Sequence, residues 1–210
     1  MGSRHAQPGF SNAKPGTTAA TNAVNKHRNR MALKSTIFKA ELHIADMDRN
    51  YYDRHAVVIA RHPSETDERM MIRLLAFALH ADLALAFGKG LSTDDEPDLW
   101  RRDRTGAIEL WIDVGRPDER RVRKACGRAA QVILYSYGGP AAALWWEQVR
   151  GRLERAGNLT VFNVPLPASQ ALSRLAKRTM QLHCTVHDGL VSFADDDERV
   201  EIEVAVLKPA

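Results

Sequence analysis

The sequence predicts a single domain of the α/β class with an α+β tendency, in which one mixed central β-sheet is flanked by helices. Between residues 99 and 165, strand-like and helix-like segments alternate, which favours parallel strands joined by right-handed crossovers. Strand-rich hairpins precede and follow this region, and they add antiparallel pairing. The chain has 210 residues, 44% of them hydrophobic, which suits one well-packed domain and is too short for two substantial ones.

The first 30 residues differ in composition from the rest. They are rich in Gly, Pro, Ser, Thr, Asn and Ala and show no hydrophobic period, so we expect residues 1–30 to be a disordered leader and residues 31–210 to be the domain. An over-extended gene start or an added segment is one reading, and a basic organelle-targeting arm is the other. The leader holds five of the 30 Lys and Arg side chains and no acid, so 25 basic side chains face 26 acidic ones in the body. A broad basic field for unspecific nucleic-acid binding is therefore not expected.

The cysteine spacing and the length of the apolar runs predict the redox state of the thiols and the cellular location of the protein. Cys126 and Cys184 have no CxxC spacing, which predicts reduced thiols and a cytoplasmic location. No apolar run approaches the roughly 18 to 20 residues that a membrane span needs. No membrane contact is expected, and nothing in the sequence indicates an oligomeric state.

The elements follow from hydrophobic periods and turn signals. The first half is predicted to hold a hairpin joined by "MDRN", a helix that starts at Pro63 and Ser64 with Asp67 in a capping-box position, a loop over 88–98, and two strands around a turn at "RTG". The second half alternates helix and strand and ends in an antiparallel meander with an Asp188-Gly189 turn. The predicted segments after the loop are strands 99–103 and 106–115, helix 116–131, strand 132–138, helix 139–157, strand 159–165, a short helix 167–178, and strands 179–187, 190–194 and 200–208.

The stretch "GAIELWIDVG", residues 106–115, carries an unusual strand face. Ala107, Glu109, Trp111 and Asp113 alternate with four aliphatic residues, which places two carboxylates and a tryptophan on one side. The aliphatic side predicts a central strand packed against another layer. An unpaired buried carboxylate costs several kcal/mol, roughly, so these acids need cations, hydrogen bonds or a metal.

Helical spacing on the first helix makes a further prediction. Glu68 falls in line with the apolar residues and is expected to face inward near the helix start. Arg69, Arg73 and His80 fall on the opposite side and are expected to face water.

Helix, hairpin, helix and strand, with acids on the first helix and the hairpin, is an order that resembles the core of the PD-(D/E)XK nucleases. Pro97-Asp98 supplies a literal "PD", and Glu109 follows eleven positions later. Phosphodiester cleavage of this kind needs Mg²⁺ on a few carboxylate oxygens. The resemblance implies Glu68, Asp98 and Glu109 as Mg²⁺ ligands, with Asp98 and Glu109 in the catalytic group.

Two details bear on this site. A turn around Arg104 and Thr105 would place Asp98 about opposite Trp111, on the face that carries Glu109. The lysine of the motif is missing, because Trp111 stands two residues beyond Glu109. Lys124 on the following basic helix, or an inward Arg, could take its place in space, and we assign Lys124 as an electrostatic helper in catalysis.

Several neighbours could instead contact a substrate or partner. Asp113 could pair with an arginine or cap the next helix, and Trp111 shares its face. Arg116 and Arg120 begin a run of basic side chains that could hold phosphates, although such runs are usually a solvated helix face. We assign Asp113, Trp111, Arg116 and Arg120 as possible contact residues.

Over residues 31 to nearly the end, the sequence resembles the YaeQ family. That family is similar in fold to a compact variant of the PD-(D/E)XK theme, and the resemblance implies no assigned activity. The stretches that carry it are "MALKSTIFKAELHIADMDRN", "ARHPSETDERMMIRLLA", "STDDEPDLW" and "LWIDVGRPDERRVRKAC".

Two functions follow as expectations. One is a Mg²⁺-dependent phosphodiesterase or nuclease acting on nucleic acid. The other is a non-catalytic module that keeps the nuclease scaffold and its acidic cluster and binds a nucleic acid or a protein. The missing lysine and the nearly neutral body favour the second.

Overall fold

A computed structural model describes residues 35–88 and 96–210 of the chain. The predicted leader, residues 1–30, and most of the predicted loop at 88–98 lie outside these ranges. Leu33–Ala210 forms one compact unit. Within the described ranges, no helix has the length and apolar character needed to cross a bilayer. Cys126 and Cys184 are both free thiols.

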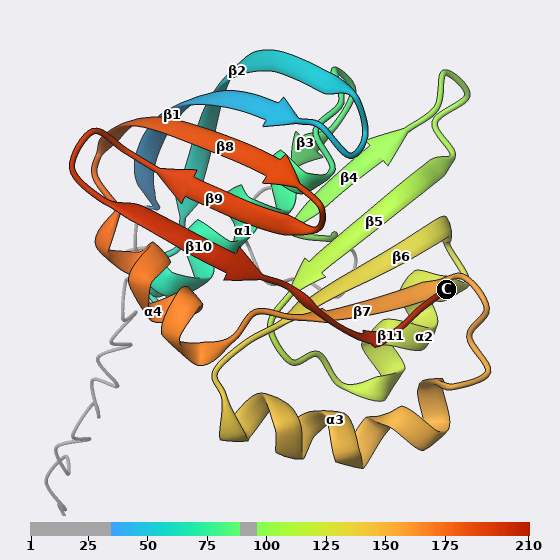
Figure 1. The fold of residues 1–210 in the computed structure, drawn as a ribbon. Helices are drawn as coiled ribbons and strands as arrows, with labels where there is room; N and C mark the ends of the chain where they lie inside the picture. Colours follow the sequence, from blue (N-terminus) through green and yellow to red (C-terminus); the bar gives the residue numbers. More distant parts are fainter. Residues whose placement is uncertain (1–34, 89–95) are drawn as a thin grey trace, which may run out of the picture. The chain divides into compact units, whose positions relative to one another are not determined.

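The fold is mixed α/β, and its strands form two sheets (Figure 1). The first sheet has the order β10-β9-β8-β1-β2 and the second has the order β11-β7-β6-β5-β4-β3. The expectation of one central sheet was therefore wrong. The strands are β1 Thr36–Asp46, β2 Tyr51–Arg61, β3 Ala86–Phe87, β4 Leu99–Arg102, β5 Ile108–Val114, β6 Ala129–Ser136, β7 Leu159–Asn163, β8 Thr179–His187, β9 Leu190–Ala194, β10 Arg199–Glu203 and β11 Ala205–Lys208. The helices are α1 Asp67–Leu79, α2 Glu119–Cys126, α3 Pro140–Leu153 and α4 Leu166–Arg174.

The first sheet arises from strands that alternate apolar and polar residues. In β1 every second residue from Phe38 is buried, and β8 repeats the pattern. β1 and β2 form the predicted hairpin, while β1 and β8 pair in parallel. The Asp188-Gly189 turn between β8 and β9 has positive φ at both positions, as a tight hairpin turn requires. The buried residues of β1 and β8 therefore lie on one face of this sheet, and that face covers the core.

The second sheet contains the parallel portion that the alternating segments predicted. β5, β6 and β7 pair in parallel, and β4 lies antiparallel on the other side of β5. β5 is thus a central strand, as expected from its aliphatic side. Leu110, Ile112 and Val114 belong to the larger core cluster, whereas Trp111 packs with α2 and α3 in a second cluster.

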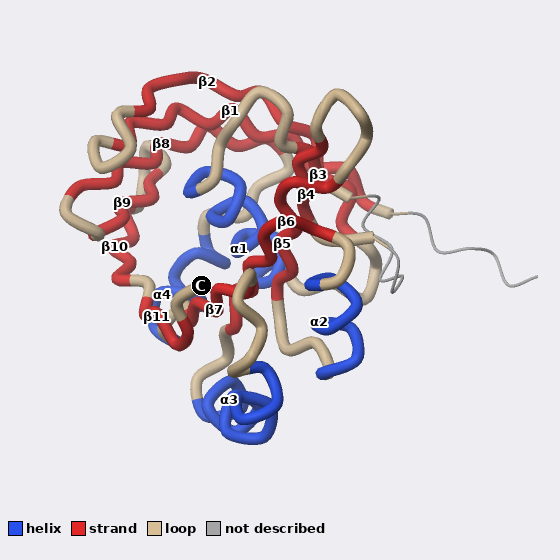
Figure 2. The backbone as a smooth tube through the Cα atoms, turned by 90° about the vertical axis from the view of Figure 1, so that its right-hand side faces the viewer, coloured by secondary structure: helices blue, strands red, loops and turns tan. Residues whose placement is uncertain are grey.

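Helix α1 lies between the two sheets (Figure 2). Every residue from Met70 to Ala78 is buried, including Arg73, whose exposed fraction is 0%. The expectation that Arg73 faces water was wrong, because a helix covered on two sides has little solvated face. The helix begins one turn later than Pro63 suggests, with Thr66 as its N-cap accepting a hydrogen bond from the Arg69 amide.

Two further expectations about strands were wrong. The predicted final strand 200–208 is interrupted at Val204, so β10 ends the first sheet while β11 joins the second at β7. The predicted β4–β5 register was also shifted by two residues, since Trp100 and not Asp98 pairs with Trp111. A register irregularity between Arg101 and Arg102 accounts for part of the shift, and sequence spacing does not reveal it.

Candidate functional site

A pocket of about 340 Å³ opens where β5 ends. Gly115, at φ +117°, turns the chain from β5 toward α2 in a conformation that favours glycine. In open α/β sheets, ligand crevices form at the carboxyl ends of strands, especially where the order of the connections changes, and β5 is the strand between antiparallel β4 and parallel β6. We call this the arginine pocket; it is lined by Arg69, Asp98, Asp113, Val114, Gly115, Arg116, Pro117, Arg121 and Tyr137.

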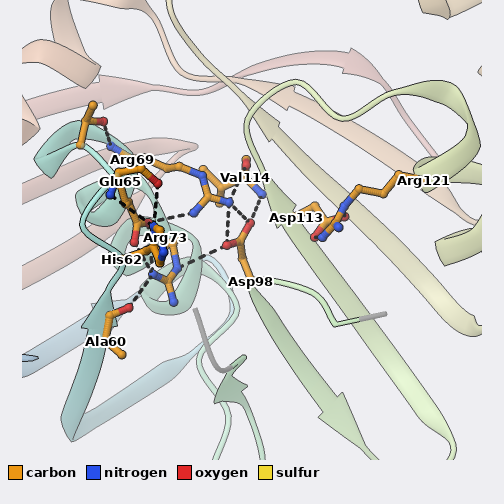
Figure 3. Close-up of polar contacts among 11 residues, drawn as sticks. Ala60, His62, Glu65, Arg69, Arg73, Asp98, Asp113, Val114 and Arg121 are labelled. Carbon is orange, nitrogen blue, oxygen red and sulfur yellow. Dashed lines mark hydrogen bonds and ion pairs between the residues drawn. The ribbon is translucent and has the colours of Figure 1, made fainter. Parts of the chain in front are cut away.

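Asp98 is held at one wall of the pocket, just before β4. It is 9% exposed, and both of its carboxylate oxygens lie 2.8 Å from Nη2 of Arg69. The backbone N–H of Val114 donates a third hydrogen bond to Asp98 at 2.7 Å. Figure 3 shows the carboxylate enclosed by these donors. Such charge-assisted bonds fix both the arginine and the end of β5.

A buried ion network supports this wall from behind. Glu65 accepts from Nη1 of Arg69 at 2.8 Å and from Nη1 of Arg73 at 3.1 and 3.2 Å. The Nε of Arg73 lies 3.5 Å from Asp98, which is an electrostatic contact and too poorly aligned for a hydrogen bond. Two arginines thus face two carboxylates, and because Arg73, Glu65 and Asp98 are buried, each charge depends on the others.

Asp113 is fixed at the opposite wall (Figure 3). Its side chain is 2% exposed, and its two oxygens accept from Nε and Nη2 of Arg121 at 3.0 and 2.9 Å. Nη2 of Arg121 also donates to the backbone oxygen of Glu96 at 3.1 Å. This two-pronged pair anchors the start of α2 to the end of β5, as the arginine-pairing alternative for Asp113 predicted.

Arg116 and Tyr137 complete the lining. Arg116 is exposed and has no hydrogen bond or ion pair with the described part of the chain. Burial raises the pKa of Tyr137, although the nearby Arg69 and Arg116 oppose that rise. Three arginines and two carboxylates line the pocket, so it carries one positive charge in excess, and Arg116 is the cation that no acid in the described residues neutralises.

The residues predicted as metal ligands lie in three different environments. Asp98 lines the pocket, Glu68 accepts a 2.6 Å hydrogen bond from the Ser169 hydroxyl on α4, and Glu109 pairs with Arg101 at 2.9 Å with 47% of its side chain exposed. Among the described residues, no three or more His, Cys, Asp or Glu side chains are grouped so that they could hold a metal ion. Asp98 is instead joined at the pocket by Asp113.

The other predicted site residues divide in the same way. Trp111 is 1% exposed and packs below α2 and α3, and Lys124 is exposed on α2 but does not line the pocket. Arg116 lines it, and Arg120 lies on the adjoining surface of α2.

Sequence reasoning missed Arg69, Glu65 and Tyr137. One signal for the first two was available, because Glu65 and Arg69 are four residues apart across a helix start, a spacing at which side chains meet. Tyr137 had none, since only the turn after β6 brings it to the end of β5.

Comparison with known proteins finds matches over most of the chain. A family model described as YaeQ protein matches residues 31–204. "Uncharacterized protein YaeQ" of Escherichia coli K12 is 45% identical over 174 residues, which span 83% of this chain and 96% of that protein, and its Salmonella typhi counterpart matches to the same extent. The crystal structure of YaeQ from Xanthomonas axonopodis pv. citri aligns with a TM-score of 0.81 at 49% identity, covering 84% of this chain and 99% of that one. The crystal structure from Pseudomonas syringae aligns with a TM-score of 0.80 at 35% identity, over 84% and 97% of the two chains.

Proposed function

This chain belongs to the YaeQ family, and from that premise and the geometry of the arginine pocket we propose that it binds phosphate groups of a nucleic acid without cleaving them. The observation that carries the proposal is Arg116, an exposed guanidinium at the pocket that no described side chain pairs with. Guanidinium groups bind phosphate oxygens through paired N–H donors. The role is that of a binding module on an α/β scaffold.

The acids of the pocket are compatible with an anionic ligand. Asp98 and Asp113 are each neutralised by an arginine, Arg69 and Arg121 respectively, at 2.8 to 3.0 Å. A phosphate that approaches Arg116 therefore meets two ion pairs whose charges are already matched, and one arginine that pairs with no side chain in the described ranges. One excess positive charge matches one phosphodiester charge.

A magnesium-dependent nuclease is the second candidate. The observation in its favour is that two buried carboxylates, Asp98 and Asp113, line the same pocket. A metal at Asp98 would have to replace the donors Arg69 and Val114, whose bonds of 2.8 and 2.7 Å already satisfy the carboxylate. Because a metal would compete with these donors for the same oxygens, the binding role is favoured.

The binding role is tested by fluorescence anisotropy with a labelled single-stranded oligonucleotide. Arg116→Gln should weaken binding about tenfold, as the loss of one charged hydrogen bond implies. Arg199→Gln, an exposed arginine on β10 in the other sheet, is the matched control and should bind like the unaltered chain. Equal affinity for the Arg116 variant and the control would overturn the proposal.

The nuclease candidate is tested on the same full chain. Labelled DNA and RNA, single- and double-stranded, are incubated with Mg²⁺ or Mn²⁺, beside a chelator control and the variants Asp98→Asn and Glu109→Ala. We expect no cleavage above these controls. Cleavage that disappears with chelator and with Asp98→Asn would replace the binding role by a metal-dependent one.

A further inference from the structure

We infer that the ligand of the arginine pocket is a single strand of nucleic acid that continues into the groove between α2 and α3, an inference that rests on the proposed function. The groove has a volume of about 920 Å³. It shares Arg116 and Pro117 with the arginine pocket, so the two depressions have a common wall. The groove is lined by Arg116, Pro117, Asp118, Glu119, Arg120, Arg123, Trp145, Gln148, Val149 and Arg152.

The charges of the groove suit a polyanion. Arg123 and Arg152 both pair with Glu119, at 2.8 and 2.9 Å, and Asp118 accepts from the Arg121 amide as the N-cap of α2. The acids of the groove are thus held by partners within the protein. Four arginines and two acids leave two positive charges in excess.

Arg120 is the second arginine of this surface for which the described residues supply no partner. It is exposed, and within residues 35–88 and 96–210 it has no hydrogen bond or ion pair. Arg116 lies on the wall shared by both depressions, whereas Arg120 belongs to the groove alone. A ligand with repeated charges can use both arginines at once, and a small anion can use only one of them.

The apolar part of the groove lining favours a single strand over a duplex. Pro117, Trp145 and Val149 contribute apolar surface, and Nε1 of Trp145 donates to the Pro117 oxygen at 2.8 Å, which holds α3 against the loop before α2. Unpaired bases can lie on apolar and aromatic side chains while the phosphates meet arginines. In a duplex the bases are stacked inside the double helix, so they cannot contact these apolar side chains.

The test compares oligonucleotide length by anisotropy, with unlabelled strands as competitors. A single-stranded decanucleotide should bind at least tenfold more tightly than a dinucleotide or a duplex of the same sequence. Arg120→Gln should weaken decanucleotide binding about tenfold and leave dinucleotide binding unchanged, because only the longer strand reaches the groove. The salt dependence of this variant should be shallower by about 0.7 in slope, the value expected when a protein neutralises one phosphate fewer on a single strand.

The outcomes separate this inference from the proposed function. If Arg116→Gln weakens both ligands but length and Arg120 have no effect, the pocket binds phosphate and the strand path is wrong. Duplex binding as tight as single-strand binding would also overturn the path. If polyglutamate displaces the decanucleotide and binds more tightly than it, an acidic peptide is the ligand and the inference fails. If neither Arg116→Gln nor Arg120→Gln differs from Arg199→Gln, the proposed function itself fails.

Discussion

At the scale of single residues, the pocket is shaped by carboxylates whose roles depend on burial. Asp98 and Glu109 stood together in the sequence as candidate metal ligands, yet one is 9% exposed among arginines and the other is an exposed partner of Arg101. Spacing cannot distinguish them, because burial depends on which elements pack over each strand end. Because Asp98 is buried and Glu109 is exposed, substitutions at the two positions should change the free energy of unfolding by different amounts.

Asp98→Asn should destabilise the fold by about 3 kcal/mol, since it leaves Arg73 buried with only Glu65 as its carboxylate partner. Glu109→Gln removes an exposed ion pair and should cost less than about 1 kcal/mol. Urea unfolding followed by circular dichroism measures both variants under the same conditions. Equal losses of stability would contradict the buried network as described.

His80 gives a residue-scale prediction for pH. It is half-buried, its Nε2 lies 2.8 Å from the Tyr135 hydroxyl, and desolvation lowers its pKa to about 4, with Arg49 and Arg101 adding to the effect. The unfolded chain binds a proton at a pKa near 6.5, before the folded chain does, so stability should fall as pH drops from about 6.5 to 4. The contribution of His80 to this loss is about 3 kcal/mol.

His80→Asn removes this titration. The difference in unfolding free energy between the unaltered chain and the variant should therefore shrink as the pH falls from about 6.5 to 4. Unfolding series at several pH values measure it, and NMR titration of the imidazole provides an independent value. A pH-independent difference would show that the His80 pKa is not lowered in the folded protein.

At the scale of elements, type and order were predictable and partners were not. The alternation of apolar and polar residues predicted the two faces of β5. The Asp188-Gly189 turn predicted the hairpin that β8 and β9 form. No local signal in the sequence predicts that residues 200–208 are divided between two sheets. Their apolar residues fit one continuous strand, and only the long-range pairing of β10 with β9 and of β11 with β7 distinguishes the two. The prediction for α1 was also incomplete, because a helical wheel assumes that only one face of the helix is covered, whereas Arg73 on the opposite face is buried as well.

Two glycines test how local conformation supports these elements. Gly115 has φ +117° at the pocket, with open space where a side chain would begin, so Gly115→Ala should destabilise by about 1 to 2 kcal/mol through backbone strain alone. Gly151 lies within α3 and also has open space, so Gly151→Ala should stabilise by about 0.5 to 1 kcal/mol. Thermal unfolding of both variants measures the two signs. A stabilising Gly115→Ala would contradict the positive φ at the pocket.

At the scale of the whole molecule, the compact unit from Leu33 onward is organised around α1. Side chains from β1 and β8 on one side and from β5 and β6 on the other meet α1 in a single core cluster. The arginine pocket depends on that arrangement, because α1 supplies Arg69 while β5 supplies the strand end that it contacts through Asp98. The sequence contains separate local signals for α1 and for β5. The contact between α1 and β5 at the pocket depends on how the two sheets pack around α1, and no local stretch of sequence predicts that packing.

A shared core predicts that the two sheets unfold together. Leu42, on β1 of the first sheet, is 0% exposed, and Leu42→Ala should cost about 3 kcal/mol. All four tryptophans, Trp100, Trp111, Trp145 and Trp146, belong to the second sheet or to α3, so their fluorescence reports the other side of the core. The variant should shift the denaturant midpoint by the same amount in tryptophan fluorescence and in circular dichroism, because a two-state unit gives coincident transitions. A fluorescence midpoint left unchanged while circular dichroism shifts would mean that α1 does not couple the sheets, and the wall that Arg69 and Asp98 form could then persist without the first sheet.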